Sequence, residues 1–473
     1  MSFDDLPVEV GPVFEGERIR GKQMYVELGG PKQEKKFELV RVVPSDKIED
    51  GRVTIIGPDI PDIEEGSNVP WGIVIEMSGD KLEEDLESVL ERRIHEFTNY
   101  IEGTMHLNQR YDVWQRVSKN AVKKGFNSLK FIGDILMRLY KAELPIVEKA
   151  QVTIYTDRGQ MEAAYNEAME IYEARDAKVR GMTDEGVDQF YGCVLCQSFA
   201  PTHVCIVTPQ RTGLCGAINW FDARASARVD PKGPNFAIEK GDAIDESLGE
   251  FSGVNEIADS KSLGEVTRVA LYSAMEVPHT SCGCFEAIVF YIPEVDGLGI
   301  VDRNFKGSAI NGLPFSTMAN QTGGGKQVPG FHGIAIEYIR SKKFLKHDGG
   351  WNRVVWMPSS VKERVKDDIP ADMVNKIATE QEVSDLEQLE AFLKEKNHPL
   401  AASIVAAEEE SEEEEEEEYG MAAAGGMPMG TMTMSVPGAG GVGGFTLILK
   451  NAKIHAEKVI IKRMDAGSKK RKK

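Results

Sequence analysis

The start of the chain alternates apolar, β-branched runs with glycine, proline and aspartate, a pattern typical of short strands separated by turns. We therefore expect residues 1–78 to be rich in β-structure. The expected strands are Met24–Leu28, Lys36–Val43, Arg52–Ile56 and Gly72–Met77.

From about Lys81 to Lys141 the apolar residues change to a helical spacing. The first predicted helix carries Leu82, Leu86, Val89, Leu90, Ile94 and Phe97 on one face. The elements predicted after it are helices at Val113–Lys124 and Leu129–Leu139, a strand at Gln151–Tyr155 and a helix at Gln160–Lys178. Glycine and aspartate interrupt the pattern near Arg180–Asp188, which indicates a domain boundary.

Strands and helices alternate irregularly in residues 189–398. The predicted elements are strands at Val204–Val207, Arg268–Tyr272, Ala287–Ile292 and Ile334–Tyr338, and a helix at Leu386–Lys394. This irregular order predicts a mixed α/β fold with α+β layers rather than a regular doubly wound sheet. We expect an N-terminal α/β domain at 1–183 and a second domain at 184–400 that carries every cysteine.

The composition changes sharply at Ala406, where a glutamate run leads into a segment of glycine, methionine and alanine. Such sequences bury no core, so we expect a disordered linker over 401–444. Residues 445–473 regain two β-like runs, Phe445–Leu449 and Val459–Ile461, before a basic end. This hairpin-like tail either docks on the sheet of a partner subunit or folds back onto its own domain.

The formal net charge of −20 argues against nucleic acid as the main partner. Ten glutamates between Glu408 and Glu418 supply half of that charge. No secretory signal or membrane-spanning run is visible, so we expect a cytoplasmic protein without a membrane partner. Thiols in a reducing compartment stay free to bind metals.

All six cysteines belong to one pattern, which is C-x2-C-x8-C-x9-C, a gap of 66 residues, and then C-G-C. Four thiolates complete either a zinc site or an iron–sulfur cluster, and the spacings of eight and nine favour iron and sulfur. The first group is Cys193, Cys196, Cys205 and Cys215.

The second group, Cys282-Gly283-Cys284, needs a metal of its own. Two thiolates and the backbone nitrogens of Gly283 and Cys284 can form a square plane of two nitrogens and two sulfurs. That donor set favours Ni(II) or Cu(II), which promote loss of the amide protons. The alternative is that these are two ordinary buried cysteines.

These segments resemble the acetyl-CoA synthase family, and in particular the β subunits of archaeal acetyl-CoA decarbonylase/synthase complexes. The resemblance rests on Gly192-Cys193-Val-Leu-Cys196-Gln-Ser-Phe199-Ala-Pro201, Cys205, Thr212-Gly-Leu-Cys215-Gly216 and Ser281-Cys282-Gly283-Cys284-Phe285-Glu286. It covers roughly residues 1–398 and implies two globular domains like the middle and C-terminal domains of the bacterial enzyme. The disordered C-terminal tail that the composition predicts follows them.

The resemblance implies the A-cluster, a 4Fe–4S cube bridged to a binuclear nickel centre. Cys193, Cys196, Cys205 and Cys215 would hold the cube, with Cys196 also bridging to the proximal nickel. Cys282 and Cys284 would bind both nickels, and the Gly283 and Cys284 nitrogens would complete the distal site.

The implied activity is that of a CO-methylating acetyl-CoA synthase, an acyltransferase that reversibly makes or cleaves acetyl-CoA. Its substrates would be CO, CoA and a methyl group from a corrinoid iron–sulfur protein, and a carbon monoxide dehydrogenase component would be a further partner. Phe199, and less securely Trp114, would wall an apolar pocket over the proximal nickel. Ordinary core packing is the alternative for both aromatic residues.

Two basic or glycine-rich segments are weak candidates for the phosphates of CoA. Gly323-Gly324-Gly325-Lys326 could cradle a phosphate, or it could form a loop beside the cysteines. The alternative for Arg340-Ser-Lys342-Lys343 is a solvated face. Two other functions remain open for the whole chain, an electron-transfer iron–sulfur protein and a zinc-stabilised scaffold subunit.

Overall fold

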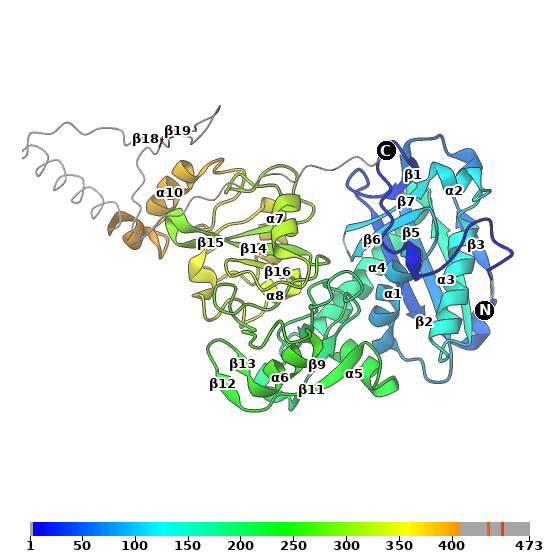
Figure 1. Cartoon of the computed structure of the whole chain (residues 1–473), viewed down its shortest axis with the longest axis horizontal. Coiled ribbons are helices and arrows are strands. Elements are labelled where there is room, and N and C mark those ends of the chain that lie inside the picture. Colours follow the sequence, from blue (N-terminus) through cyan, green and yellow to red (C-terminus); the bar gives the residue numbers. More distant parts are fainter. Residues whose placement is uncertain (1–2, 111, 407–432, 436–445, 449–473) are drawn as a thin grey trace, which may run out of the picture. The chain divides into compact units, whose positions relative to one another are not determined.

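The computed structural model describes residues 3–110, 112–406, 433–435 and 446–448. The chain divides into two compact units, Met1–Ile404 and Val405–Lys473. All six cysteines belong to the first unit. Helices and several separate sheets share this unit, which confirms the predicted mixed α/β class (Figure 1).

Two four-stranded sheets form the N-terminal part of the first unit, drawn in blue and cyan in Figure 1. The first sheet has the order β4-β1-β7-β6 and the second has the order β2-β5-β8-β3. In the second sheet β5 runs parallel to β2 and antiparallel to β8. The strands are β1 Met24–Gly29, β2 Lys36–Val42, β3 Val53–Ile56, β4 Ser67–Val69, β5 Trp71–Ser78, β6 Thr104–Gln109, β7 Asp112–Ser118 and β8 Lys149–Tyr155.

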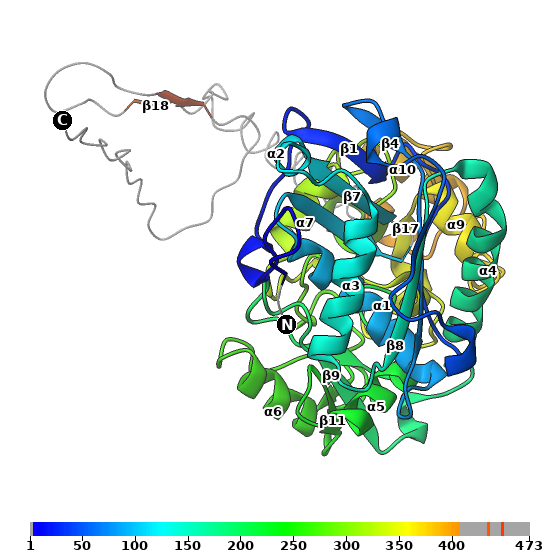
Figure 2. The same cartoon turned by 90° about the vertical axis from the view of Figure 1, so that its right-hand side faces the viewer.

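Helices cover both faces of the second sheet, and Figure 2 shows two of them, α3 and α4, on opposite sides of β8. The face that carries Ile73 and Ile75 packs in one core with α1 and α3, whereas Phe37 and Leu39 pack with α4. Side chains alternate between the faces because a strand has a period of two. The helices are α1 Glu87–Asn99, α2 Lys119–Lys123, α3 Lys130–Glu143 and α4 Arg158–Ala177.

The cysteine part contains a three-stranded sheet of order β10-β9-β11, a small β12-β13 pair and a four-stranded sheet of order β16-β14-β15-β17. Its strands are β9 Gln189–Cys193, β10 Cys205–Val207, β11 Asn235–Glu239, β12 Ala243–Asp245, β13 Glu250–Phe251, β14 Ala287–Ile292, β15 Gly297–Asp302, β16 Phe331–Ile334 and β17 Val354–Trp356. Its helices are α5 Trp220–Val229, α6 Ser252–Lys261, α7 Phe315–Thr322, α8 Ile336–Ile339, α9 Ser359–Val365 and α10 Leu386–Glu395. The cysteines therefore lie at strand ends and in the loops between strands.

The helix predicted at Val113–Lys124 is wrong, because β7 occupies its first half, up to Ser118, and only the short α2 follows. Val113 and Val117 are buried while Trp114 and Arg116 are partly exposed, and this period of two is that of a strand. β7 pairs with β1 on one side and β6 on the other, so the sheet satisfies its backbone groups. The prediction also omits β6.

Two predicted strands of the cysteine part need correction. Arg268–Tyr272 forms no strand, because the amides of its last two residues donate to carbonyls of the loop at 248–249. The strand predicted at Ile334–Tyr338 ends at its first residue, and α8 begins at Ile336. Glu286 fixes that turn, since its Oε2 accepts the Ile336 N–H at 2.8 Å. The other predicted elements of residues 1–398 are present with shifts at their ends, and the largest is at the first helix, where α1 begins at Glu87 and leaves Leu82 and Leu86 before it.

In the second unit, β18 Thr433–Ser435 pairs antiparallel with β19 Thr446–Ile448. The strand predicted at Phe445–Leu449 is confirmed as β19. The other predicted run, Val459–Ile461, lies outside the described residues together with the basic end and most of the predicted linker.

Candidate metal centre

The strand register places the first and third cysteines side by side. Cys193 is the last residue of β9 and Cys205 is the first residue of β10. The two strands are antiparallel, and these two residues are direct partners. Directly opposed residues of such a pair have Cβ atoms about 4.5–5.5 Å apart, so the two thiols share one side of the sheet.

Tight turns bring Cys196 and Cys215 to the same place. The Cys196 carbonyl accepts a hydrogen bond from the amide four residues later at 2.9 Å. Around Cys215, the Gly216 N–H donates to the Gly213 carbonyl at 2.8 Å. Gly216 has a φ of +72°, and a Cβ there would lie 2.3–2.5 Å from the Glu286 carboxylate, so this turn requires glycine.

The two cysteine groups meet at one small cavity of about 20 Å³. All six cysteines are buried. The cavity is lined by the four cysteines of the first group together with Cys282, Arg92 and His203. The two cysteine groups, which 66 residues separate in the sequence, therefore meet at a single site in the fold.

Cys196, Cys282 and Cys284 form a sulfur triad whose Sγ atoms all lie within 4.8 Å of one another. The Cys284 N–H donates to Cys282 Sγ at 3.2 Å, so the turn folds its sulfur toward its own backbone. Gly283 has a φ of +131°, which favours glycine, and a Cβ there would have no heavy atom within 4 Å. This arrangement gathers three thiols within a short distance of one another, which is a donor set for a thiophilic metal.

Arg92 brings a positive charge to the sulfur triad from α1. Its Nη2 lies 3.1 Å from Cys284 Sγ and 3.8 Å from Cys196 Sγ. Burial opposes the charge of Arg92, but the nearby Cys284 and Cys196 outweigh it and raise the pKa of the guanidinium above its ordinary value. Arg92 is therefore a permanent cation beside the sulfurs.

Arg303 brings a second positive charge to the backbone side of the C-G-C turn. Its Nη2 donates to the Gly283 carbonyl at 2.7 Å and to the Phe285 carbonyl at 3.2 Å. Its guanidinium lies 4.8 Å from the centre of the Phe315 ring. The turn thus has a cation on its sulfur and another on its carbonyl.

The thiols differ in how readily they ionise. Burial raises the pKa of Cys193 to about 11 and also raises the pKa of Cys205 and Cys215. Hydrogen bonds from Cys196 and Cys282, with a further contribution from the Arg92 guanidinium, hold the pKa of Cys284 well below its ordinary value. The first group therefore needs the charge of a metal to become thiolate at neutral pH.

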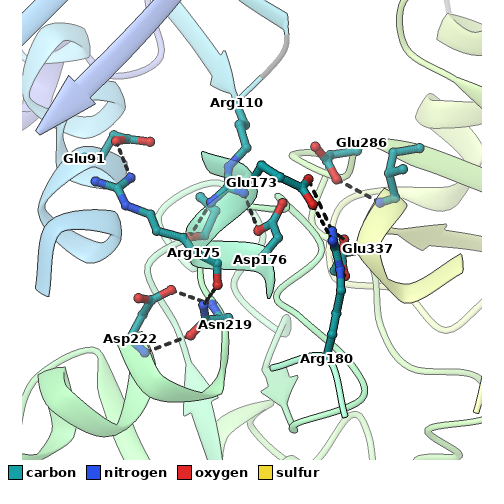
Figure 3. Close-up of polar contacts among 12 residues, drawn as sticks. Glu91, Arg110, Glu173, Arg175, Asp176, Arg180, Asn219, Asp222, Glu286 and Glu337 are labelled. Carbon is teal, nitrogen blue, oxygen red and sulfur yellow. Dashed lines mark hydrogen bonds and ion pairs between the residues drawn. The ribbon is translucent and has the colours of Figure 1, made fainter. Parts of the chain in front are cut away.

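Buried ion pairs hold α1 against α4, and a hydrogen bond joins α4 to the cysteine part (Figure 3). Arg175 of α4 donates to Glu87 and Glu91 of α1 at 2.8 and 2.9 Å. The Arg175 carbonyl accepts a hydrogen bond from Asn219 Nδ2 at 2.9 Å, and Asn219 caps the start of α5. This junction fixes the helix that carries Arg92.

Two family models match the chain. Residues 6–161 match the CO dehydrogenase/acetyl-CoA synthase complex beta subunit, and residues 172–405 match the C-terminal part of the ACS/CODH beta subunit. The acetyl-CoA decarbonylase/synthase complex subunit beta 2 of Methanosarcina thermophila is 56% identical over 467 residues, covering 97% of this chain and 98% of that protein. The chain belongs to this family of beta subunits.

A relative from a second organism has a similar extent. Subunit beta 2 of the same complex from Methanocaldococcus jannaschii is 57% identical over 460 residues, covering 97% of each chain. A solved structure of the C-terminal domain of an acetyl-coenzyme A synthase alpha subunit is 40% identical, covers 26% of this chain and 96% of that chain, and has a TM-score of 0.24. The two family models divide between residues 161 and 172, and the predicted boundary at 183–184 stays a prediction.

The two aromatic residues expected in the substrate pocket of a beta subunit have different surroundings. Phe199 is 40% exposed, three residues after Cys196, and its ring meets the His95 ring edge-on at 6.4 Å. Trp114 is partly exposed on β7 and lies 4.8 Å below the Arg116 guanidinium. Neither is among the described residues that line the cysteine cavity, and the role of both stays a prediction.

The glycine loop considered for CoA phosphates lies instead against the cysteines of the beta subunit. The Gly324 N–H donates to the Cys282 carbonyl at 2.9 Å, and the Gly325 N–H donates to the Ser281 carbonyl at 2.8 Å. These amides are therefore used to hold the C-G-C backbone, which agrees with the alternative of a loop beside the cysteines.

Sequence reasoning missed a group of buried histidines next to the site. The His203 ring lies 5.7 Å from that of His279, which lies 6.1 Å from that of His332. Burial lowers the pKa of His203 to about 4 and lowers the pKa of the other two, with Arg211 adding to the effect. All three are neutral at pH 7, and their spacing in the sequence carries no signal that predicts their meeting.

Proposed function

We propose that this beta subunit makes and cleaves acetyl-CoA by combining a methyl group, CO and CoA at a metal centre. The observation that carries the proposal is the burial of all six cysteines around one site, with the Cys196, Cys282 and Cys284 sulfurs within 4.8 Å of one another. The names of the relatives, which are subunits of an acetyl-CoA decarbonylase/synthase complex, support this reaction.

We assign a 4Fe–4S cluster to Cys193, Cys196, Cys205 and Cys215, and a binuclear nickel unit to Cys196, Cys282 and Cys284 with the Gly283 and Cys284 nitrogens. Two observations support the fit. The position that a Cβ of Gly283 would occupy has no heavy atom within 4 Å. Arg92 Nη1 is a buried donor with no hydrogen-bond partner among the described residues, which is costly unless an anionic group lies nearby.

The protein itself supplies a buried, positively charged environment for the metal unit. When bound, the nickel unit supplies a soft metal position that is open to a methyl group, CO and a thiolate. The buried thiols keep water away from that position, and Arg92 offsets the charge of the sulfurs. We assign Phe199, which is 40% exposed and lies three residues after Cys196, to the wall of the substrate pocket.

The partners follow from the substrates. A corrinoid iron–sulfur protein would deliver the methyl group and a carbon monoxide dehydrogenase component would deliver CO. The tail beyond Val405 would dock on a partner subunit. Among the described residues no helix is both long and apolar enough to cross a membrane, and a cytoplasmic location stays a prediction.

Metal analysis tests the proposal directly. After anaerobic reconstitution we expect about two nickel and about four iron per chain, together with exchange of labelled CoA into acetyl-CoA. Iron without nickel would indicate an electron carrier, and zinc alone would indicate a scaffold; either result refutes the proposal.

Two cysteine variants sharpen the test. Cys284→Ser should lose nickel and lower the exchange rate by at least about 100-fold while iron stays near four, because only the C-G-C turn is changed. Cys205→Ser should lower iron first, since Cys205 lies opposite Cys193 and away from the triad. Equal loss of both metals in both variants would contradict the division of the ligands.

A further inference from the structure

Both carbonyl oxygens of the C-G-C turn accept a hydrogen bond. The Gly283 carbonyl shares a peptide bond with the Cys284 nitrogen, and it accepts from Arg303 Nη2 at 2.7 Å. The Cys282 carbonyl shares a peptide bond with the Gly283 nitrogen, and it accepts from the Gly324 N–H at 2.9 Å. Each nitrogen assigned to nickel is therefore conjugated with a hydrogen-bonded oxygen.

This pairing matters because a peptide nitrogen binds a metal in a square plane only after it has lost its proton. The resonance that makes the peptide bond planar then spreads the negative charge onto the carbonyl oxygen. A hydrogen bond to a charged acceptor is roughly twice as strong as one between neutral groups. Donors already aimed at the oxygen where charge develops stabilise that charge, as they do in an oxyanion hole.

The charges can be counted for the single nickel ion that the two sulfurs and two nitrogens of the turn would hold. Nickel(II) brings two positive charges, and two thiolates with two deprotonated amides bring four negative charges, so the unit carries a net charge of minus two. Two thiol and two amide protons leave to solvent. Arg303 at the Gly283 oxygen and Arg92, 3.1 Å from the Cys284 sulfur, supply two positive charges.

We infer that Arg303, with the Gly324 N–H, stabilises the deprotonated form of the Cys282-Gly283-Cys284 peptide that binds nickel. The inference rests on the proposed function, because it assumes that nickel occupies the turn. Arg303 contacts a ligand peptide and not a substrate, so it is a positioning residue.

The surroundings of Arg303 favour such a role. Its guanidinium is held over the Phe315 ring, and its Nε is a buried donor without a partner among the described residues. Asp112 acts on it electrostatically, but in the described part of the chain Arg303 has no ion pair within 4.0 Å. A neutral carbonyl offers this cation only a dipole, whereas a deprotonated peptide offers a full negative charge.

Nickel retention by the full-length, reconstituted chain tests the inference. Arg303→Met keeps an apolar stem over Phe315 but removes the donor, and Arg303→Lys keeps the charge. Arg353→Met is the matched control, since Arg353 also donates to a backbone carbonyl, that of Asp296 at 2.9 Å, and lies over an aromatic ring. Each protein is titrated with a nickel chelator while nickel and iron per chain and the square-planar signature at the nickel absorption edge are measured.

We expect Arg303→Met to release one nickel at about 10- to 100-fold lower chelator concentration, with iron unchanged and the square-planar signature lost first. Arg303→Lys should show a smaller shift, and Arg353→Met should behave as the unmodified chain. If Arg303→Met does not fold, the Arg303→Lys shift decides the result.

Two outcomes would overturn the inference. One is an Arg303→Met or Arg303→Lys chain that holds nickel as tightly as the unmodified chain does. The other is a parallel loss of iron and nickel, which would indicate a general structural role. An unmodified chain that takes up no nickel would instead refute the proposed function, so the two failures are distinguishable.

Discussion

The four buried arginines in the described part of the chain form two pairs with opposite surroundings. Arg110 and Arg175 lie at the junction shown in Figure 3, and each forms ion pairs with one or two carboxylates. Arg92 and Arg211 form no ion pair with a described carboxylate. Arg92 contacts sulfur, and the charge of Arg211 lowers the pKa of Cys205 against the larger effect of burial.

The difference shows how the two regions serve the molecule. A buried charge without a partner is expensive, so buried arginines are normally matched by acids. The junction follows that rule and holds α1 in place. The cysteine site breaks the rule, and it does so where the proposed metal–thiolate centre would supply the missing negative charge. Departures from local consistency of this kind are expected at functional sites.

The largest expected loss of stability comes from a substitution that breaks the junction. Arg175→Leu leaves Glu91 without its ion-pair partner and leaves Glu87 with only Arg41, at 3.5 Å, and removing one member of a buried pair costs about 3–5 kcal/mol. Arg92→Leu leaves no buried carboxylate unpaired, so we expect a loss of only about 1 kcal/mol from its hydrogen bonds to sulfur. Denaturant unfolding of the metal-free, full-length chain measures both.

We expect the two variants to rank in the opposite order when metal content is measured instead of stability. Arg175→Leu should keep its iron and nickel wherever it folds, whereas Arg92→Leu should lose nickel more readily because it removes the cation beside Cys284. The contrast between the two regions fails if Arg92→Leu destabilises the metal-free chain as strongly as Arg175→Leu does.

A smaller loss of stability is expected from alanine substitution of Gly216 and Gly283, and the loss should differ between the two glycines. Gly216→Ala places a Cβ 2.3–2.5 Å from the Glu286 carboxylate at a φ of +72°, so we expect a loss of about 2–3 kcal/mol and a lower melting temperature. Gly283→Ala meets nothing within 4 Å, and only its φ of +131° is strained, so we expect about 1–2 kcal/mol.

Metal content again distinguishes the two substitutions. Gly283→Ala should lower nickel selectively, because it distorts the turn whose nitrogens are assigned to nickel. Gly216→Ala should lower iron and nickel together, since it moves Cys215. Unchanged nickel in Gly283→Ala at a normal melting temperature would count against backbone ligation.

The sequence predicts the cysteine site well because its pattern is local. Every thiol lies within two short segments, and the family resemblance that these segments carry implies that both belong to one site. Arg92 could not be found in this way, because it precedes Cys284 by 192 residues and ordinary helix periodicity makes it one more polar residue of α1. The sequence gives no reason to single out Arg303 either, since only the folded turn shows which carbonyl it contacts.

The same limit explains the errors in the fold. The apolar residues of Val113–Lys124 fit a helical spacing as well as an alternating one, and the pairing of β7 with two neighbouring strands decides between them. Arg268–Tyr272 has the composition of a strand, but its amides find partners in a loop instead. In both cases contacts distant in the sequence override a local preference.

A pH-dependent effect tests whether every charge of the junction is matched. Burial raises the pKa of Asp222 to about 7, although the Asn219 N–H donates to it and Arg175 and Arg110 lie nearby. The unfolded chain releases this proton near pH 4, so the folded state binds more protons between about pH 4 and 7 and loses stability as the pH rises through that range. One such group accounts for at most about 2–3 kcal/mol between pH 5 and 7.

Asp222→Asn keeps an oxygen that accepts the Asn219 N–H but cannot ionise. Its unfolding free energy should therefore fall less steeply than that of the unmodified chain between pH 5 and 7, and the two curves should run parallel below about pH 4. Asp245→Asn is the control, because Asp245 is close to solvent and hydrogen bonds from the Leu248 and Ser247 amides lower its pKa. If the Asp222→Asn curve has the same slope as that of the unmodified chain, Asp222 is ionised in the folded state and Arg175 and Arg110 neutralise it. The junction would then be fully paired, and the cysteine site alone would hold unmatched buried charge.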